Sequence, residues 1–180
     1  MKNKIKNQGW LLLNMNSKIA HQIKHRKKPN DEFITPQALA DELVQLVPVK
    51  STDIICDNAY GTGVFMRSFD KIDVAIRHST KDFFNWHTQQ DWFITNPPYS
   101  ALDRWLNHSC QYATKGFAYL LGLHNLTPRR IEMCEQKGFK ITHIHLCKVF
   151  KWFGISAFII WQKTPLQCGI QLTYDRIVWR

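Results

Sequence analysis

The chain contains a run of four residues, Asn96-Pro97-Pro98-Tyr99, whose types suit the binding of a flat ligand that carries an amino group. The side-chain oxygen of Asn96 and a carbonyl of the Pro-Pro turn can each accept a hydrogen bond from one NH2 group. Neither proline has an N–H to donate, and both have a fixed φ, so these carbonyls are held rigidly. The ring of Tyr99 can lie over the ring that bears the amine. The alternative interpretation is a strand that ends in a proline-rich turn.

A second run, residues 57–63 (DNAYGTG), also follows an apolar segment that is typical of a buried strand. Gly61 and Gly63 allow the backbone to approach a ligand where a Cβ would clash. The run is neither G-x-G-x-x-G nor a P-loop, and alone it is equally typical of a tight strand-to-helix turn. In an open α/β sheet, ligands bind at the carboxyl ends of strands where the strand order reverses. We therefore expect the two runs to lie side by side, one holding a nucleoside-like cofactor and the other presenting an amine to it.

The elements that must position these runs alternate between apolar strands and amphipathic helices, which predicts an α/β fold with a doubly wound, mostly parallel sheet. The expected strands are 53–57, 72–77, 81–85, 91–96, 117–123, 140–148 and 156–162, and the tail 169–180 is a further candidate edge strand. The last two of the seven should form an antiparallel pair near one edge. Helices are expected from Thr35-Pro36, with Thr35 as N-cap, from about Ala101 to Thr114, and from Thr127-Pro128 to Gly138.

Composition predicts one domain with a full apolar core, because the 180 residues are 44% apolar and 13% aromatic. No apolar run approaches the roughly 20 residues that cross a bilayer, and residues 10–13 are too few for a signal-peptide core, so we expect a cytoplasmic protein. The five cysteines are scattered and form no C-x-x-C, which argues against disulfides and zinc. His143 and His145 would share one strand face without an evident third ligand, so no metal site is predicted.

The net charge of +10 is concentrated at the amino terminus. Residues 1–30 hold eight basic side chains and no acidic one, whereas the other 150 residues hold 16 basic and 14 acidic. We therefore divide the chain into a basic arm, 1–30, and a folded domain, 31–180. Such an arm is typical of contact with nucleic-acid phosphates without reading of sequence, and the alternative is a solvated leader.

Four stretches of the chain, in order, resemble the amino-methyltransferases that use S-adenosylmethionine, above all the small adenine-specific DNA methyltransferases of phages and prophages. The stretches are Phe33-Ile34-Thr35-Pro36, residues 57–63, Lys81-Asp82-Phe83-Phe84, and Asn96-Pro97-Pro98-Tyr99. The resemblance covers about residues 31–163. It implies a seven-stranded methyltransferase-type sheet, S-adenosylmethionine as cofactor, and methyl transfer to the exocyclic amine of adenine in DNA.

The resemblance also implies a role for each matching residue on the cofactor side. Thr35 would contact the methionine end, with Phe33 packing nearby. The pocket around the methionine and ribose would be formed by Asp57, Ala59, Gly61 and Gly63. Asp82 would accept a hydrogen bond from the amino group of the cofactor's adenine, and Phe83 would pack on that ring.

On the target side, the resemblance implies that Asn96 and the Pro97 carbonyl, held by the rigid Pro97-Pro98 turn, bind the amine. Tyr99 would stack on the target base. An aromatic of the 150–153 loop (Phe150, Trp152 or Phe153) would sandwich the base from the other side. A base in a duplex must be flipped out to reach such a pocket, at a cost of a few kcal/mol.

Two departures from the family pattern leave other functions open. The second strand of the family ends in an acidic residue that binds the ribose hydroxyls, whereas here Ile76 or Arg77 would stand there, which should weaken cofactor binding. The chain also has no dedicated target-recognition domain, so selectivity must come from the arm, the 148–156 loop or a partner chain. The alternatives are a methyltransferase acting on an RNA base or a protein glutamine amine, and a non-catalytic subunit that binds nucleic acid.

Overall fold

The computed structural model of the chain describes residues 33–149, 154–164 and 169–180. The basic arm predicted at 1–30 and the loop aromatics Phe150, Trp152 and Phe153 lie outside the described residues. The predictions made for them therefore stay predictions.

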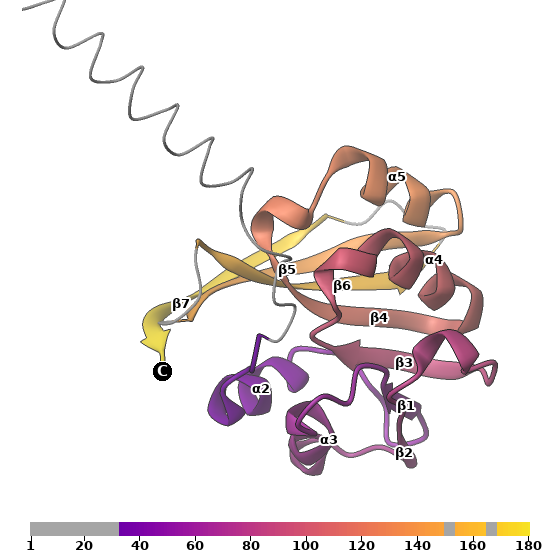
Figure 1. Cartoon of the computed structure of the whole chain (residues 1–180), viewed down its shortest axis with the longest axis horizontal. Helices are drawn as coiled ribbons and strands as arrows, with labels where there is room; N and C mark the ends of the chain where they lie inside the picture. Colours follow the sequence, from indigo (N-terminus) through magenta and orange to yellow (C-terminus); the bar gives the residue numbers. More distant parts are fainter. Residues whose placement is uncertain (1–32, 150–153, 165–168) are drawn as a thin grey trace, which may run out of the picture. The chain divides into compact units, whose positions relative to one another are not determined.

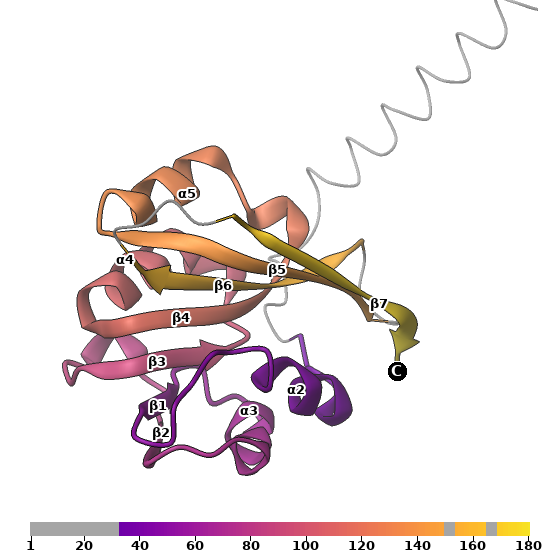
Figure 2. The ribbon, with the colours of Figure 1, turned by 180° about the vertical axis from the view of Figure 1, so that it is seen from behind.

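The described strands form one seven-stranded sheet in the order β2-β1-β3-β4-β6-β5-β7 (Figure 1). The strands are β1 (Ile54–Asp57), β2 (Ile76–Ser79), β3 (Gln90–Thr95), β4 (Ala113–Gly122), β5 (Phe139–Val149), β6 (Ser156–Lys163) and β7 (Gln171–Trp179). Strands β2, β1, β3 and β4 are parallel, β6 is antiparallel to both β4 and β5, and β7 is parallel to β5. The predicted fold class is therefore confirmed. The tail also forms the expected edge strand, β7, beside β5 (Figure 2).

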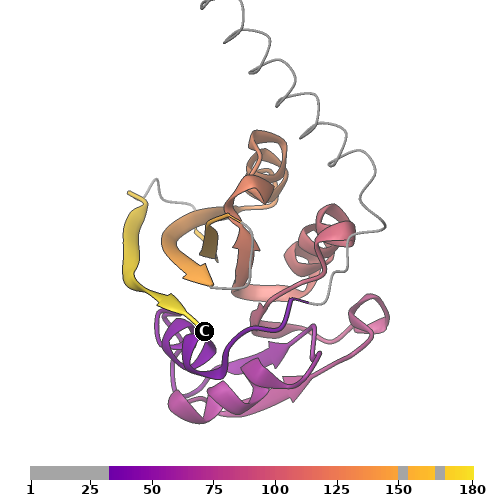
Figure 3. The ribbon, with the colours of Figure 1, turned by 60° about the vertical axis from the view of Figure 1, so that its left-hand side comes forward.

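Helices cover both faces of this sheet. α2 (Gln37–Val44) and α3 (Val64–Ser68) lie on one face, and α4 (Leu102–Tyr112) and α5 (Pro128–Glu135) lie on the other (Figures 1 and 3). Successive residues of a strand point to opposite faces of the sheet, so the strands contribute side chains to two apolar cores, one on each face. Trp92 and Ile94 pack on the α2–α3 side, whereas Phe93 packs on the α4 side. Strands buried on both faces explain why the sequence shows continuous apolar runs there.

The strand order reverses between β1 and β3. The chain passes from β1 outward to β2 and then returns to β3 on the opposite side of β1. The carboxyl ends of β1 and β3 therefore flank the crevice where α/β sheets bind ligands. Residues 57–63 leave the end of β1, and Asn96 follows the end of β3 directly. The structure thus places the two runs side by side, as expected.

Three local predictions were wrong, and each has a physical reason. Residues 81–85 form no strand; Phe83–Asn85 is a 3-10 helix, η2. A strand would send Phe83 and Phe84 to opposite faces, whereas both rings pack against Trp105. The second strand is not 72–77 but Ile76–Ser79, because Ser79 pairs with Asp57 at the end of β1.

The third correction concerns the start of the first described helix. α2 begins at Gln37 with Pro36 at the N-cap position, and no side chain caps its first turn. Thr35 therefore does not cap this helix as predicted. Its hydroxyl accepts a hydrogen bond from Asn96 at the end of β3 instead. In the stretches that the structure describes, no helix is long and apolar enough to cross a membrane.

Candidate active site

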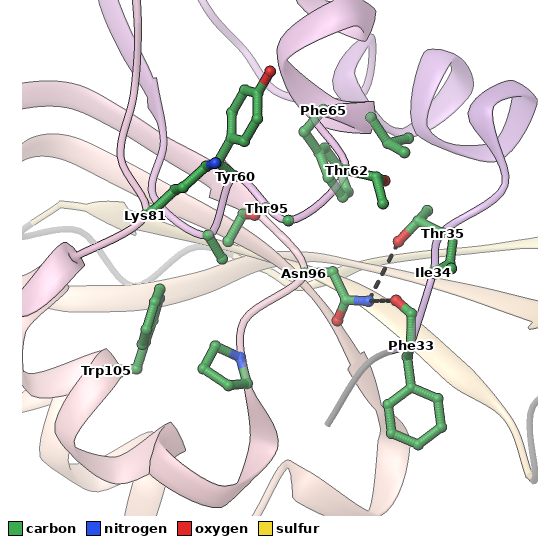
Figure 4. Close-up of a pocket in the computed structure, with 14 residues that line it drawn as sticks. Phe33, Ile34, Thr35, Tyr60, Thr62, Phe65, Lys81, Thr95, Asn96 and Trp105 are labelled. Atoms are coloured by element: carbon green, nitrogen blue, oxygen red, sulfur yellow. Dashed lines mark hydrogen bonds between the residues drawn. The ribbon is translucent and has the colours of Figure 1, made fainter. Parts of the chain in front are cut away.

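A cavity of about 680 Å³ opens at the carboxyl ends of β1 and β3 (Figure 4). This volume lies within the range of small-molecule and cofactor sites, roughly 300–1,000 Å³. The residues that line it are Phe33, Ile34, Thr35, Ala59, Tyr60, Gly61, Thr62, Val64, Phe65, Lys81, Thr95, Asn96, Pro98 and Trp105. The wall thus combines apolar side chains with a few polar groups, which is the composition of a ligand site.

The structure brings half of the twelve predicted site residues that it describes to the wall of this cavity, whereas Gly63, Pro97 and Tyr99 are among those that do not line it. Those that line it are Phe33, Thr35, Ala59, Gly61, Asn96 and Pro98. The carboxyl of Asp57 lies buried behind the wall, where it accepts a hydrogen bond from Thr95. Asp82 does not line the wall; it is exposed and accepts a hydrogen bond from Asn85.

The side-chain amide of Asn96 has a defined orientation (Figure 4). Its Nδ2 donates to the carbonyl oxygen of Phe33 at 2.9 Å and to the Thr35 hydroxyl at 3.3 Å. Its Oδ1 is shielded from solvent and has no hydrogen-bond partner within the described residues. Because buried acceptors in folded proteins nearly always have a donor, this oxygen is suited to receive one from a ligand.

Asp57 carries a second buried acceptor of this kind. Its Oδ1 accepts from the Thr95 hydroxyl at 2.7 Å and from the Ala59 N–H at 3.3 Å, whereas Oδ2 has no partner in the part of the chain described. Burial raises the pKa of Asp57 from 3.8 to about 6, although the hydrogen bonds from Thr95 and Ala59 and the nearby backbone N–H of Met66 act to lower it. An adjacent cation or N–H donor on a ligand would stabilise the ionised carboxylate.

The first half of the loop after β1 is held by two hydrogen bonds to Thr80, just beyond the end of β2. The Thr80 N–H donates to the Asp57 carbonyl at 3.0 Å, and the Tyr60 N–H donates to the Thr80 carbonyl at 3.1 Å. Gly61 and Gly63 have φ values of 47° and 74°, which is the left-handed region that favours glycine. A Cβ on Gly63 would also lie 2.9 Å from the Tyr60 ring. The glycines therefore permit a tight turn that exposes backbone to the cavity.

Tyr99 is already in contact with another aromatic ring. Its ring stacks on that of Phe33 with centroids 5.4 Å apart and planes inclined by 23°. A target base can therefore stack on this face of the Tyr99 ring only if Phe33 moves. The Pro98 carbonyl accepts from the Ala101 N–H at 3.3 Å within η3 (Tyr99–Ala101), which favours Pro97 as the source of the second amine acceptor.

Phe83 does not occupy the position that the resemblance implies. It is 1% exposed, does not line the cavity, and packs against Phe93 and Trp105. Trp105, on the first turns of α4, lines the cavity instead and offers a flat apolar surface at that end. The sequence predicts a helix around residues 101–114, but it does not reveal that Trp105 on this helix contacts the cavity.

The sequence reasoning also missed Lys81. Its side chain lines the cavity, with Nζ lying 5.5 Å from the centroid of the Tyr60 ring. β2 ends at Ser79, so the residues at its carboxyl end are Ser79, Thr80 and Lys81. The family's ribose-binding carboxylate is therefore missing here as well, and a cation stands near its place.

No known protein family and no curated protein matches this chain by sequence. Solved structures do match its fold. A Listeria monocytogenes protein assigned to the class I S-adenosylmethionine-dependent methyltransferases is 14% identical with a TM-score of 0.63, covering 84% of this chain and 68% of its own.

Two other solved structures share this fold. The modification subunit assigned to a type I restriction enzyme of Vibrio vulnificus is 11% identical with a TM-score of 0.64, covering 95% of this chain and 52% of its own. A protein of Pyrococcus horikoshii assigned as an RNA methyltransferase is 17% identical with a TM-score of 0.55, covering 77% and 91%. At these identities the likeness shows the fold, which is that of class I methyltransferases.

Proposed function

We propose that this protein transfers a methyl group from S-adenosylmethionine to the exocyclic amine of adenine in DNA. The observation that carries the proposal is the unpartnered Oδ1 of Asn96, a residue of the cavity wall; the oxygen itself is shielded, so a ligand NH2 must displace the atoms that cover it. An amide oxygen fixed in this way suits a ligand NH2. The neighbouring glycine turn and the Asp57 carboxyl suit a cofactor with a cationic end.

The residues present fit the proposed cofactor in three respects. The cavity has the volume of a nucleoside-sized ligand site. Gly61 exposes backbone in a left-handed turn, and the buried Oδ2 of Asp57 has no donor among the described residues. Thr35 and Ala59 would border the methionine portion, and Trp105 would pack on the adenine ring. Bound there, S-adenosylmethionine supplies an activated methyl group on its sulfonium.

The chain's own residues would act by positioning and by charge. The lone pair of an aromatic exocyclic amine is delocalised into its ring. Asn96 Oδ1 and the Pro97 carbonyl would accept one hydrogen bond from each amine hydrogen, which favours a pyramidal nitrogen whose lone pair points at the methyl group. With S-adenosylmethionine bound, the N–C bond would form as the methyl C–S bond broke, S-adenosylhomocysteine would leave as the neutral thioether, and the methylated nitrogen would lose a proton to water. No general base is required at this step.

Two features favour DNA over other substrates that carry an amine, because both suit a polyanionic partner. The eight basic residues of the arm suit phosphate contacts that do not read sequence. The similar fold of a restriction-modification subunit is consistent with DNA, although the chain spans only about half of that subunit. Tyr99 would provide the stacking surface for a flipped base, a contact that contributes about 1–3 kcal/mol.

One observation favours a second candidate, a non-catalytic subunit that binds nucleic acid. No carboxylate stands at the carboxyl end of β2, where Lys81 reaches the cavity wall. Such a protein would show salt-sensitive DNA binding without cofactor binding. An RNA base or a protein glutamine amine also remains an alternative substrate, since Asn96 would bind any such NH2.

The test is transfer of labelled methyl groups from S-adenosylmethionine to DNA, RNA and protein fractions in parallel. We expect label in DNA as N6-methyladenine, and we expect Asn96→Ala to abolish it. Asn107→Ala on α4 is the matched control, because this asparagine does not line the cavity. Label in RNA or protein alone would replace the proposed substrate, and full activity of a folded Asn96→Ala variant would refute the site.

A further inference from the structure

The amide of Asn96 is held by a segment far away in the sequence. Its Nδ2 donates to the Phe33 carbonyl, 63 residues earlier, at 2.9 Å and to Thr35 Oγ1 at 3.3 Å. A backbone carbonyl can only accept, so the atom that faces Phe33 has to be the NH2 group. Rotation of the amide by 180° would place Oδ1 against that carbonyl. The segment 33–35 therefore dictates that Oδ1 turns the other way (Figure 4).

This segment is fixed independently of Asn96. Thr35 is 5% exposed and leads directly into α2. α2 is tied to α3 through Gln37, whose Nε2 donates to the Ser68 hydroxyl at 2.8 Å and to the Val64 carbonyl at 3.2 Å. Because α3 follows the glycine turn, the position of residues 33–35 is coupled to the same loop that borders the cavity. The segment that orients the amide is thus itself positioned by helix packing.

We propose that residues 33–35 are the positioning element of the amine-acceptor site, with the Phe33 carbonyl and the Thr35 hydroxyl holding Asn96 so that only Oδ1 faces the target amine. This inference rests on the proposed function and deepens it. Thr35 also lines the cavity, on the side where the resemblance places the cofactor's methionine. In this proposal Thr35 borders the cofactor directly, and it acts on the target amine only through its hydrogen bond with Asn96.

The proposal requires an amide at position 96 and predicts that a carboxylate cannot replace it. In Asn96→Asp, a carboxylate oxygen would replace Nδ2 and face the Phe33 carbonyl, where two acceptors repel. We expect methyl transfer to fall by about 100-fold or more, comparable to the loss of one directed group in other active sites. An Asp variant with near-normal turnover would overturn the proposal, because the carboxylate offers the same acceptor to the amine.

Thr35 provides a milder, shape-matched test. Thr35→Val keeps the β-branched shape and removes the acceptor, whereas Thr35→Ser keeps the hydroxyl. At saturating cofactor and DNA, we expect kcat of the Val variant to fall about threefold to tenfold, the equivalent of one hydrogen bond. KM for DNA should change little, and the Ser variant should recover most of the loss. Equal kcat in the Val and wild-type proteins would contradict the proposal, as would a Ser variant no better than Val.

A substrate-free measurement separates this inference from the proposed function. In a ¹⁵N-labelled full-length chain, the side-chain NH2 signals of Asn96 can be assigned by their loss in Asn96→Ala. We expect these protons to exchange with water about tenfold more slowly than the side-chain NH2 protons of the exposed Gln89, and Thr35→Val to shift one of the Asn96 signals. Fast exchange in the wild-type protein would overturn the inference. Slow exchange in a protein that does not bind S-adenosylmethionine would refute the function and leave the positioning role intact.

Discussion

Asp57 gives a quantitative prediction, because burial of its carboxyl disfavours the ionised form. It is 1% exposed, and burial raises its pKa from the ordinary value of 3.8 to about 6. Between these two pH values the unfolded chain has released this proton and the native chain has not. The native state therefore binds more protons, and its stability must fall as the pH rises through this range. One unit of pKa corresponds to about 1.4 kcal/mol, so a rise from 3.8 to about 6 lowers the free energy of unfolding by about 3 kcal/mol at high pH.

Asp57→Asn removes the titration and keeps the shape. An asparagine oxygen can still accept from the Thr95 hydroxyl, which lies 2.7 Å from Oδ1 of Asp57. We expect the free energy of unfolding of the variant, minus that of the wild type, to increase by about 3 kcal/mol between pH 3 and pH 8. Urea unfolding at several pH values measures this difference. Asp73→Asn is the matched control, since it makes the same change at an exposed position.

The same variant tests the proposed contact with the cofactor. The wild-type affinity for S-adenosylmethionine should rise as the pH increases from 5 to 7, because Asp57 becomes ionised and attracts the cationic ligand. The Asn variant should bind at least about tenfold more weakly at pH 7, without this pH dependence. Parallel pH profiles of unfolding for wild type and Asp57→Asn would refute the reasoning about burial. Equal cofactor affinities would refute the assignment of Oδ2 to the ligand.

Three further substitutions have defined outcomes. Lys81→Glu places a carboxylate near the missing ribose acceptor, so calorimetry should show S-adenosylmethionine binding about tenfold more tightly than in wild type, whereas Lys81→Met should not. Phe33→Ala removes the ring that stacks on one face of Tyr99 and keeps the backbone carbonyl, so KM for DNA should fall several-fold; an unchanged KM would show that the base does not use this face. Asp53→Ala leaves the Trp92 indole N–H without its buried acceptor, so urea unfolding should show a loss of about 3 kcal/mol, with cofactor affinity unchanged.

Much of the architecture is predictable from the sequence, because the central strands are buried on both faces. Their apolar runs stand out against the polar turns, and the two runs that end β1 and β3 must share one sheet edge in a doubly wound fold. The strand β2 was misplaced because Ile72 and Val74 alternate like a strand. They instead pack against the core before the strand begins, and pairing with β1 determines where β2 lies.

The parts of the site that the sequence does not reveal depend on contacts between distant residues. Phe83 and Trp105 are both apolar aromatics, and only the packing of η2 under α4 decides that Trp105 borders the cavity and Phe83 does not. The orientation of the Asn96 amide depends on a carbonyl 63 residues away. The stacking of Phe33 on Tyr99 likewise joins two segments that only the fold brings together.

The most direct test of the central claim is a calorimetric titration of the full-length protein with S-adenosylmethionine at pH 7.5. The account predicts one site per chain with saturable heat at micromolar to submillimolar ligand. It also predicts that Gly61→Val, which puts a β-branched side chain at a φ of 47°, abolishes this heat. A folded wild-type protein that gives no binding heat at millimolar S-adenosylmethionine would contradict the assignment of the cavity.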